Sequence, residues 1–568
     1  MHIDAVPNRG SRPAYLLRES FREGRKVRKR TLANLSALPD EQIFAIRAVL
    51  RGEKLHPADE LFEAIASRPH GHVEAVRVAM QRLGFESLVA SRRCRERDLV
   101  CAMVAARVIA PHTKLATTRW WHTTTLAEEY EVAGADEDEL YGAMDWLLER
   151  QGAIEQKLAA RHLGEGSLVL YDLSSSYFEG TTCPLAKLGH NRDGKKGKLQ
   201  VNYGLLTDRR GCPVAVSVYD GNTNDAKTLM PQVDKLKKDF GLQTLVLVGD
   251  RGMIAQKAID ELREHDQVAW ITALKTGQIR ALVEGGQLQL GLFDDKNLFE
   301  LSHSDFPAER LIACRNPELA KLRSRTRQSL LEATEKELQK VRGMVERGRL
   351  SGRDAIGVRV GKVVNKYKVA KHFALDIEDH RFSFHRLQDN IAAEAALDGI
   401  YIIRTSLAKK QMTAADCVRN YKSLAQVERA FRSMKTIDLK IRPIHHHLAD
   451  RVRSHIFLCM LAYYVEWYMR EAWRPLLFAD EDQLAKTTRD PVAAAKRSAA
   501  AAAKAAAHLL YDGTPAHSFS TLQQELATIV RNTCRAPQAA EAAPTFKVTT
   551  TPNPKQRRAL ELLNAIRL

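Results

Sequence analysis

The sequence predicts an α/β protein in which a mixed β-sheet is flanked by helices and interrupted by an inserted segment. Between residues 165 and 275, short apolar runs typical of buried strands (SLVLYD, TLVLVG, VAWITA) alternate with helical periodicity. A further apolar run, GIYIIRTS at 399–406, resumes this pattern. The intervening residues 276–398 hold strand-like pieces and a long charged helix at roughly 316–348. We therefore expect residues 276–398 to be an insertion into the sheet domain.

Length and charge narrow the class of protein. The chain has 568 residues, which is enough for several domains, and 45% hydrophobic with 27% charged residues indicates a globular protein. Lys and Arg number 87 against 69 Asp and Glu, a formal net charge of +18. A protein this basic commonly meets a polyanion, and nucleic acid is the leading candidate. A ribosome-associated protein, a membrane-surface protein and a basic enzyme remain alternatives.

The sequence contains no sign of export or of membrane insertion. The opening residues lack an apolar signal region, and we expect a cytoplasmic protein with no membrane partner. The longest apolar run, which begins at Ile456, is too short to span a bilayer and contains Glu466, so it predicts a buried helix. The eight cysteines have no zinc-site spacing and are expected to be reduced, largely buried thiols.

We predict five regions along the chain. The first is a mainly helical N-terminal region that opens with a basic β-hairpin and serves DNA binding or dimerisation. A sheet domain in two parts is separated by the insertion, and a helical, Ala-rich C-terminal region follows, partly flexible after residue 535 but with a possible final helix, QRRALELLNAI. The boundaries are 1–164, 165–275, 276–398, 399–470 and 471–568.

Two smaller segments carry specific expectations. Residues 12–36 alternate around Gly24 with seven Lys and Arg between Arg18 and Arg30, which predicts the basic hairpin. The stretch GNTNDAKT predicts a turn and a helix cap. Residues 189–198, GHNRDGKKGK, form a loop of basic character.

Three carboxylates are candidates for metal binding. Asp172 and Asp250 follow apolar strands, at sheet edges where sites are often built. Glu428 lies in YKSLAQVERAFRSMK, where spacings of seven residues place Tyr421, Glu428 and Lys435 on one face of a predicted helix. Carboxylates suit Mg²⁺ and Mn²⁺, and phosphoryl transfer can use two such ions about 3.5–4 Å apart.

Each of these residues also has an ordinary structural interpretation. A strand-end Asp is often a loop cap, and a lone Glu on a basic helix is often a solvated charge. The three consecutive histidines at 445–447 cannot all face one ion on a regular element, so we expect packing or phosphate contacts from them rather than metal binding.

Taken together, VLYDLSSSYFEG, LVLVGDRGM, GIYIIRTS and YKSLAQVERAFRSMK resemble the DDE transposases of bacterial insertion sequences, in particular insertion-sequence family four and its relatives. Tyr421, Glu428 and Lys435 match that family's signature in identity and spacing. Leu424 stands where the signature has Arg, which indicates a related branch.

The resemblance implies an RNase H-like catalytic core with Asp172, Asp250 and Glu428 as ligands of two Mg²⁺ ions, for which Mn²⁺ substitutes. It also implies that Tyr421 and Lys435 contact the DNA backbone. The cations beside the acids, Arg251, Arg429 and Arg432, are further candidates for DNA contacts.

The function implied is a transposase that binds the terminal inverted repeats of its element as double-stranded DNA, cuts there, and joins the freed end to target DNA. Synapsis of two ends predicts a homodimer on DNA. Two alternatives remain: an RNase H-like DNA nuclease without strand transfer, and a catalytically inactive relative that only binds DNA.

Overall fold

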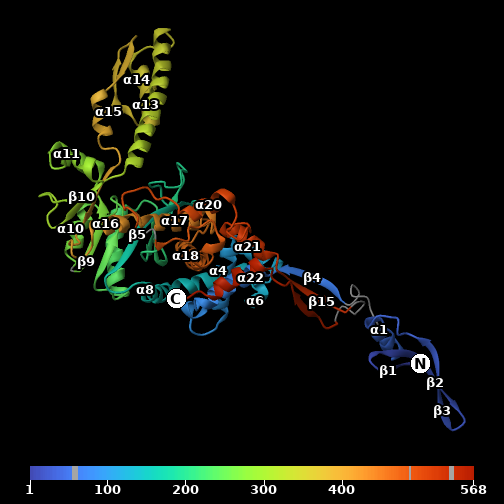
Figure 1. The fold of residues 1–568 in the computed structure, drawn as a ribbon. Coiled ribbons are helices and arrows are strands. Elements are labelled where there is room, and N and C mark those ends of the chain that lie inside the picture. The colour runs from blue at the N-terminus through green and yellow to red at the C-terminus, as the bar shows by residue number, and fades with distance from the viewer. Residues whose placement is uncertain (54–61, 266, 485–487, 537–542) are drawn as a thin grey trace. The chain divides into compact units, whose positions relative to one another are not determined.

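The computed structural model describes residues 1–53, 62–265, 267–484, 488–536 and 543–568. The chain forms two units, shown in Figure 1 and described separately below. The first comprises residues 1–68 and 530–551, and the second comprises residues 69–529 and 552–568.

The first unit contains two small antiparallel sheets. Its elements are β1 (His2–Asn8), β2 (Ser11–Glu23), β3 (Lys26–Asn34), α1 (Asp40–Leu50), β4 (Glu63–Pro69), β15 (Val530–Arg535) and β16 (Phe546–Thr549). β2 and β3 turn at Gly24, where φ is +60°, and form the predicted hairpin, with β1 as a third strand. Every residue of β3 is exposed, so its four cations face solvent.

The other sheet of this unit corrects two expectations. Its strand order is β16–β15–β4. β4 interrupts the region predicted to be helical, and β16 lies in the tail predicted to be loose after residue 535. The described parts of that tail are therefore more ordered than its Pro-, Ala- and Thr-rich composition indicated.

The second unit begins with a group of helices, as the periodicity predicted. They are α2 (Gly71–Arg82), α3 (Phe85–Val89), α4 (Arg95–Ile109), α5 (Lys114–Trp120), η2 (Trp121–Thr123), α6 (Leu126–Glu129), α7 (Glu137–Glu149) and α8 (Gln151–His162). Side-chain caps set some of the boundaries: Thr113 accepts the Ala116 N–H and Asp136 accepts the Glu139 N–H. Apolar side chains of α4 and α7 pack against the later helix α18 (Ala449–Ala472).

A mixed eight-stranded sheet is the centre of the second unit (Figure 1), in agreement with the predicted fold class. The strands are β5 (Ser167–Tyr177), β6 (Gln200–Thr207), β7 (Pro213–Asp220), β8 (Leu245–Val248), β9 (Val268–Ala273), β10 (Leu298–Leu301), β11 (Arg310–Arg315) and β14 (Ile400–Thr405). Their order is β10–β11–β14–β9–β8–β5–β6–β7. Only the β5–β8 and β8–β9 pairs are parallel within the described sheet.

β5 is longer than its apolar run indicated. We expected the strand to end at Asp172, but it continues through Ser174 to Tyr177, so Asp172 lies inside the strand rather than just past its end. The polar residues of this extension are paired with β6, whose eight residues are all buried. Three of these residues are buried serines, and because a run of serines is not typical of a buried strand, the sequence did not predict the extension.

Helices connect and flank these strands. They are η3 (Asp225–Thr228), α9 (Leu229–Asp234), the π-helical turn η4 (Lys235–Asp239), α10 (Gln256–Arg263), α11 (Thr276–Glu284), α12 (Leu292–Asp295), α16 (Ala414–Lys422), α17 (Leu424–Arg432) and the π-helical turn η6 (Ser433–Ile437). The predicted cap before η3 is present, since the Asn224 side chain accepts the Ala226 N–H. α17 packs against β5, and its Phe431 ring lies edge-on to Tyr203 of β6 at 5.7 Å.

The predicted insertion, 276–398, is only partly separate from the sheet. Two of its strands, β10 and β11, are paired into the central sheet beside β14. Residues 317–398 leave the sheet and form α13 (Pro317–Glu346), α14 (Arg353–Tyr367), η5 (Ala370–His372), β12 (Phe373–Ile377), β13 (Phe382–Arg386) and α15 (Gln388–Ala395). α13 agrees with the predicted charged helix, and this segment has its own hydrophobic cluster, built by α13, α14 and the β12–β13 hairpin.

The C-terminal part of the second unit contains η7 (Arg474–Leu476), α20 (Ala499–Ala507), α21 (Phe519–Ala527) and the predicted final helix, α22 (Pro554–Asn564). α18, which holds the apolar run from Ile456, is almost wholly buried, as expected. In the described residues no single helix meets the length and hydropathy needed to cross a membrane, although the bent pair Arg95–Ile109 and Lys114–Thr123 does so jointly. All eight cysteines are free thiols, and seven of them are buried.

A close contact between β5 and β6 gives a test of this core. A Cβ on Gly204 would lie 2.2 Å from the hydroxyl oxygen of the fully buried Tyr171. We expect Gly204→Ala to lower the free energy of unfolding by about 1–3 kcal/mol through overpacking, measured by chemical denaturation. Gly357→Ala is the matched control, since nothing lies within 4 Å of its Cβ in α14; there we expect a gain of about 0.5–1 kcal/mol from helix propensity. Equal effects of the two changes would contradict this packing.

Candidate active site

A pocket of about 460 Å³ lies where β5, β8 and α17 meet. All three predicted carboxylates, Asp172, Asp250 and Glu428, line it. The other lining residues are Leu173, Ser174, Arg192, Asp193, Asp225, Phe431, Arg432, Lys435, Thr436 and Arg442. The structure thus brings together side chains separated by more than 250 residues of sequence.

Strand register places the first two carboxylates side by side. β5 and β8 run parallel with Leu170 opposite Val248, so Asp172 and Asp250 each lie two residues beyond the last pair of this ladder. Neighbouring strands are about 4.8 Å apart. The shared register therefore brings these two carboxylates to the same level of the sheet.

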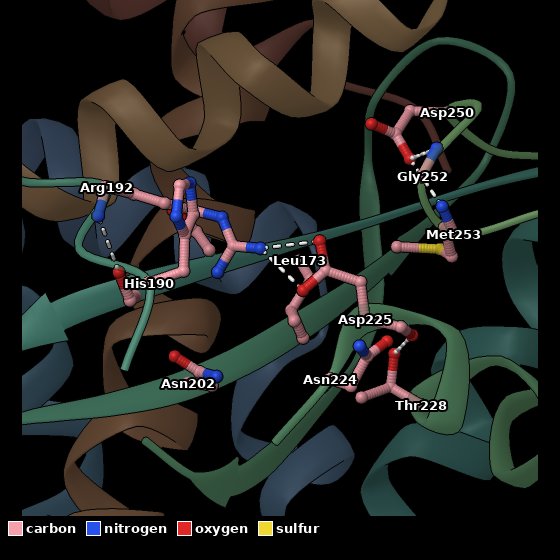
Figure 2. Close-up of polar contacts among 12 residues, drawn as sticks. Leu173, His190, Arg192, Asn202, Asn224, Asp225, Thr228, Asp250, Gly252 and Met253 are labelled. Carbon is pink, nitrogen blue, oxygen red and sulfur yellow. Dashed lines mark hydrogen bonds and ion pairs between the residues drawn. The ribbon is translucent and has the colours of Figure 1, made fainter. Parts of the chain in front are cut away.

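Hydrogen bonds orient both aspartates. Asp250 accepts the backbone N–H groups of Gly252 (2.9 Å) and Met253 (2.8 Å) through Oδ1 (Figure 2). It is therefore a loop cap, and its Oδ2 atom has no hydrogen bond to the described residues. Asp172 accepts the Leu173 N–H at 2.8 Å. Burial, and then the negative charges of Asp250 and Glu428, raise the pKa of Asp172 to about 7.

α17 brings Glu428 to the pocket because its opposite face is apolar. Val427, Ala430 and Phe431 are buried against the sheet, and Glu428 is left exposed. The prediction of a single helix through 421–435 is wrong. Tyr421 is the last residue but one of α16, Glu428 is on α17, and Lys435 is in the π-helical turn η6.

Tyr421 and Lys435 nevertheless lie close to the carboxylates. Burial raises the pKa of Tyr421 to about 12, and Asp250 and Glu428 add to this rise, which indicates that its hydroxyl is near both acids. Lys435 lines the pocket itself but is only 8% exposed.

Asp193 holds two cations at the edge of the pocket. Its carboxylate, 2% exposed, forms ion pairs with Lys435, at 2.6 Å, and with Arg442, and accepts the Tyr177 N–H at 3.0 Å. The Lys435 ammonium also donates to Ser174 Oγ at 3.1 Å. Lys435 is therefore a fixed cation rather than a freely exposed one.

Arg192 and Asp225 form a second ion pair in the pocket. Both carboxylate oxygens of Asp225 lie 2.6 Å from one terminal nitrogen of Arg192 (Figure 2). The Arg192 charge acts against the rise in the Asp172 pKa. This pair joins the 189–198 loop to the first residue of η3.

A buried polar group also supports η6, the turn that carries Lys435. Glu466 on α18 is fully buried and accepts the Ser433 hydroxyl at 2.9 Å and the Arg470 guanidinium at 2.5 Å. Arg470 also pairs with Asp438, just after η6, at 2.8 Å. Burial raises the pKa of Glu466 to about 7 despite the Arg470 charge.

Three arginines were also predicted to contact DNA, and only one of them, Arg432, lines the pocket. Arg432 is exposed and lines the pocket. Arg251 is exposed, and its charge acts on Tyr421. Arg429 is exposed but does not line the pocket; its charge acts on Tyr463 of α18.

His445, His446 and His447 lie in different surroundings, in agreement with the expectation that they do not share one ion. The His446 ring packs on Tyr141 and on His455, at 5.9 and 5.0 Å between centroids, and the His447 Nδ1 lies 2.7 Å from the Thr182 hydroxyl. His445 is exposed.

The donor set in the pocket suits a hard divalent cation. Three carboxylates face one cavity, and the pKa of Asp172 is raised by burial first and then by the charges of Asp250 and Glu428, effects that a bound cation would offset. Among the residues that the structure describes, no three His, Cys, Asp or Glu side chains are yet close enough to hold an ion together. The chemistry of the donors fits such a metal.

Sequence reasoning missed four residues of the pocket, namely Arg192, Asp193, Asp225 and Arg442. Arg192 and Asp193 lie in the 189–198 loop, whose basic composition concealed a buried acid. Asp225 was interpreted only as part of a turn and helix cap. No sequence signal showed that Arg442 would face Asp193.

Residues 166–465, more than half of the chain, match the family model described as the transposase DDE domain. Residues 3–61 match the N-terminal domain of IS1634 family transposases. No curated protein matches the sequence. Among eight matching solved chains, one from a piggyBac transposase synaptic complex with hairpin DNA is 8% identical, with a TM-score of 0.34, covering 80% of this chain and 76% of that chain.

The raised pKa of Asp172 predicts a pH-dependent loss of stability. The folded-state pKa of about 7 exceeds the ordinary 3.8, so the folded state binds the extra proton and stability falls as pH rises between these values. Without divalent ions, we expect Asp172→Asn to be more stable than wild type by about 2 kcal/mol at pH 8, a value discounted for partial solvation. The advantage should shrink towards pH 4.

Thermal and chemical unfolding in EDTA from pH 4 to pH 8 measure this difference. Asp376→Asn, at an exposed position on β12, removes a charge away from the pocket and should show no such trend. Parallel stability curves for wild type and Asp172→Asn would contradict the assigned electrostatics.

The Asp193 ion pairs predict strong energetic coupling. Asp193→Asn leaves Lys435 and Arg442 without their carboxylate, and we expect a loss of about 3–5 kcal/mol. Adding Lys435→Met should recover part of that loss, because one buried cation is then removed. Denaturant unfolding of the two single variants and the double variant gives the coupling energy. Additive effects would show that the pair does not act as a unit.

Proposed function

Because this chain belongs to the DDE transposase family, we propose that it binds the terminal inverted repeats of its own insertion sequence and catalyses DNA cleavage and strand transfer in the carboxylate pocket. The observation that carries the proposal is the convergence of Asp172, Asp250 and Glu428 on one cavity. The family is known for dependence on divalent metal ions. The two-ion site, with Mg²⁺ as the native ion and Mn²⁺ as a substitute, is part of the proposal.

In this proposal Asp172, Asp250 and Glu428 hold the ions. Once bound, the ions supply a water or hydroxyl nucleophile of lowered pKa and stabilise the leaving oxygen in an in-line phosphoryl transfer. Asp250 presents Oδ2 to the pocket because its Oδ1 is engaged by the Gly252 and Met253 N–H groups. Asp172 must lose its proton to act as a ligand, so activity should rise with pH towards and above 7.

Cations around the pocket would hold the scissile DNA strand. Arg432 and Arg251 are exposed and free to reach phosphates, and the Tyr421 hydroxyl lies near the acids. The Lys435–Asp193–Arg442 cluster has two cations for one carboxylate, so it keeps a net positive charge for a phosphate while remaining ordered. Arg429 faces another direction and is a weaker DNA contact than the sequence predicted.

The finer classification and the domain organisation belong to the same proposal. We assign an RNase H-like core at 165–275 and 399–470, supported by the mixed sheet order and the pocket at its parallel strands. An insertion domain within 276–398 is supported by the separate hydrophobic cluster of residues 331–382. Leu424, partly buried against the main core, occupies the signature Arg position of insertion-sequence family four in a related branch.

Partners and location complete the proposal. The exposed basic strand β3 suits double-stranded DNA, so the N-terminal region, 1–164, is assigned to binding of the repeats or dimerisation. The C-terminal region, 471–568, is assigned a supporting role. Two element ends and a target DNA require a homodimer on DNA, in the bacterial cytoplasm.

The decisive test is a cleavage assay on a plasmid that carries the gene with its native flanks. Wild type with Mg²⁺ or Mn²⁺ should cut at the inverted repeats, and Glu428→Gln should lose at least about 100-fold in rate, the scale of a single catalytic group. DNA binding should be retained, because Gln keeps the shape of the side chain and removes a charge that repels phosphate. Glu264→Gln, an exposed Glu after α10, is the matched control and should cut normally.

Each outcome separates the candidate functions. Discrete cuts at the repeats, lost in Glu428→Gln, support the transposase. Scattered nicks lost in the same variant would favour a nuclease without strand transfer. Full cutting by Glu428→Gln would refute the site, and DNA binding without any cutting by wild type would indicate an inactive DNA-binding relative.

A further inference from the structure

A second pocket lies at the point where α13 leaves the central sheet. Its volume is about 610 Å³, larger than that of the carboxylate pocket. Residues from the end of β11, the first three turns of α13 and the chain after α15 line it. They are Arg315, Ala320, Lys321, Ser324, Arg325, Arg327, Gln328, Ala395 and Asp398. None of these residues belongs to the carboxylate pocket.

The lining is strongly cationic. Four Lys and Arg residues face one carboxylate, Asp398. Both oxygens of Asp398 are engaged by the Arg327 guanidinium, at 3.0 and 2.5 Å, and among the described residues Asp398 forms no ion pair with Lys321 or Arg325. Arg325 has no ion pair with the described residues, and Lys321 pairs only with the exposed Glu318, at 3.3 Å. The pocket therefore has an excess of positive charge.

Helix geometry presents two of these cations as a pair. Lys321 and Arg325 are four residues apart on α13, so they share one face of the helix. Residues 321–326 are all exposed, and no acidic residue occurs between Glu318 and Glu332. Beyond Glu332, acids and bases alternate along α13. The charge of this helix is thus concentrated beside the sheet.

The pocket is also fixed to the sheet that carries the catalytic candidates. The Asn316 side chain caps α13 by accepting the Leu319 N–H, and the Asn316 N–H donates to the Gly399 carbonyl at 2.9 Å. A Cβ on Gly399 would lie 2.4 Å from the Asn316 carbonyl oxygen, so the backbone segments at residues 316 and 399 are in close contact. Gly399 leads directly into β14, the strand before α16 and α17.

We infer that the pocket which presents Lys321 and Arg325 binds backbone phosphates of the DNA duplex that is cut in the carboxylate pocket. An open, cationic cavity with an array of exposed cations suits a polyanion that runs along the surface. Its attachment to β14 gives the bound phosphates a fixed position relative to Glu428. The inference rests on the proposed function and adds a second anchoring site outside the catalytic pocket.

Charge reversal tests the inference. Lys321→Glu/Arg325→Glu is compared with Lys336→Glu/Lys340→Glu, which makes the same charge change at the same spacing farther along α13. Both pairs are exposed, and in each pair one Lys has a Glu partner three residues before it, Glu318 or Glu337. Circular dichroism and thermal unfolding check that both variants keep the fold.

The readout is binding to duplex DNA from the gene's flanks at a series of salt concentrations. Loss of two phosphate contacts should make the slope of log K against log salt less steep by about 1.8 in the Lys321/Arg325 variant. The Lys336/Lys340 variant should keep the wild-type slope. The difference should disappear with duplexes too short to reach both pockets.

Three results would overturn the inference, and they differ from one another. Equal slopes in the two variants, with wild type binding and cutting DNA, would refute the phosphate pocket and leave the proposed function intact. Equal losses in both variants would indicate a general effect of charge rather than a site. Failure of wild type to bind any DNA would refute the proposed function together with this inference.

Discussion

β5 and β8 run parallel through four residue pairs, from Ser167 opposite Leu245 to Leu170 opposite Val248, and the arrangement of the carboxylate pocket depends on that register. A shift by one residue would turn either Asp172 or Asp250 to the other face of the sheet. The register is fixed from both sides, because β5 is also paired with the fully buried β6 and β8 with β9. Packing of Phe431 on Tyr203 then brings the third carboxylate to the same edge.

The pocket is an electrostatic compromise among groups of opposite sign. Asp172 is partly buried and lies near two other acids, and the pKa of its carboxyl is raised by the burial first and by their charges second. The neighbouring cations do not neutralise the three acids directly, because Lys435 and Arg442 are held by Asp193 and Arg192 is held by Asp225. Glu466 on α18 likewise holds a cation, Arg470, and it anchors η6 by accepting the Ser433 hydroxyl. The result is a preorganised polar site whose negative centre is left for a cation.

Much of the architecture was predictable because the apolar runs of β8, β9 and β14 are short, continuous and bounded by turns. Apolar runs before Asp172 and Asp250 and the signature spacing around Glu428 predicted the three acids that line the pocket. Two of the reasons were incomplete, since β5 continues past Asp172, and Tyr421, Glu428 and Lys435 do not share one helix. The extension of β5 was not, because Ser174, Ser175 and Ser176 are buried polar residues whose partners are distant in sequence. Asp193 was missed for the same reason: its partners, Lys435 and Arg442, come more than 240 residues later.

Local patterns also failed where tertiary contacts changed the backbone. The break between α16 and α17 and the π-helical turn η6 have no sequence signal, yet they decide where Tyr421 and Lys435 lie. The contacts of Glu466 and Arg470 around this turn account for its geometry. β16 was not predicted because its four residues lie in a tail rich in Pro, Ala and Thr, although its partner β15 (Val530–Arg535) is close in sequence.

The position of β14 in the middle of the sheet has a consequence for synthesis on the ribosome. Until residue 405 has emerged, β9 lacks the partner on its outer side and β11 lacks its inner neighbour, so the nascent sheet has an open edge. The nascent chain already carries Asp172 and Asp250 at that stage, but Glu428 has not yet emerged. A transcript broken within the α13–α15 segment would therefore yield a polypeptide that is prone to aggregation and has only two of the three acids that line the carboxylate pocket.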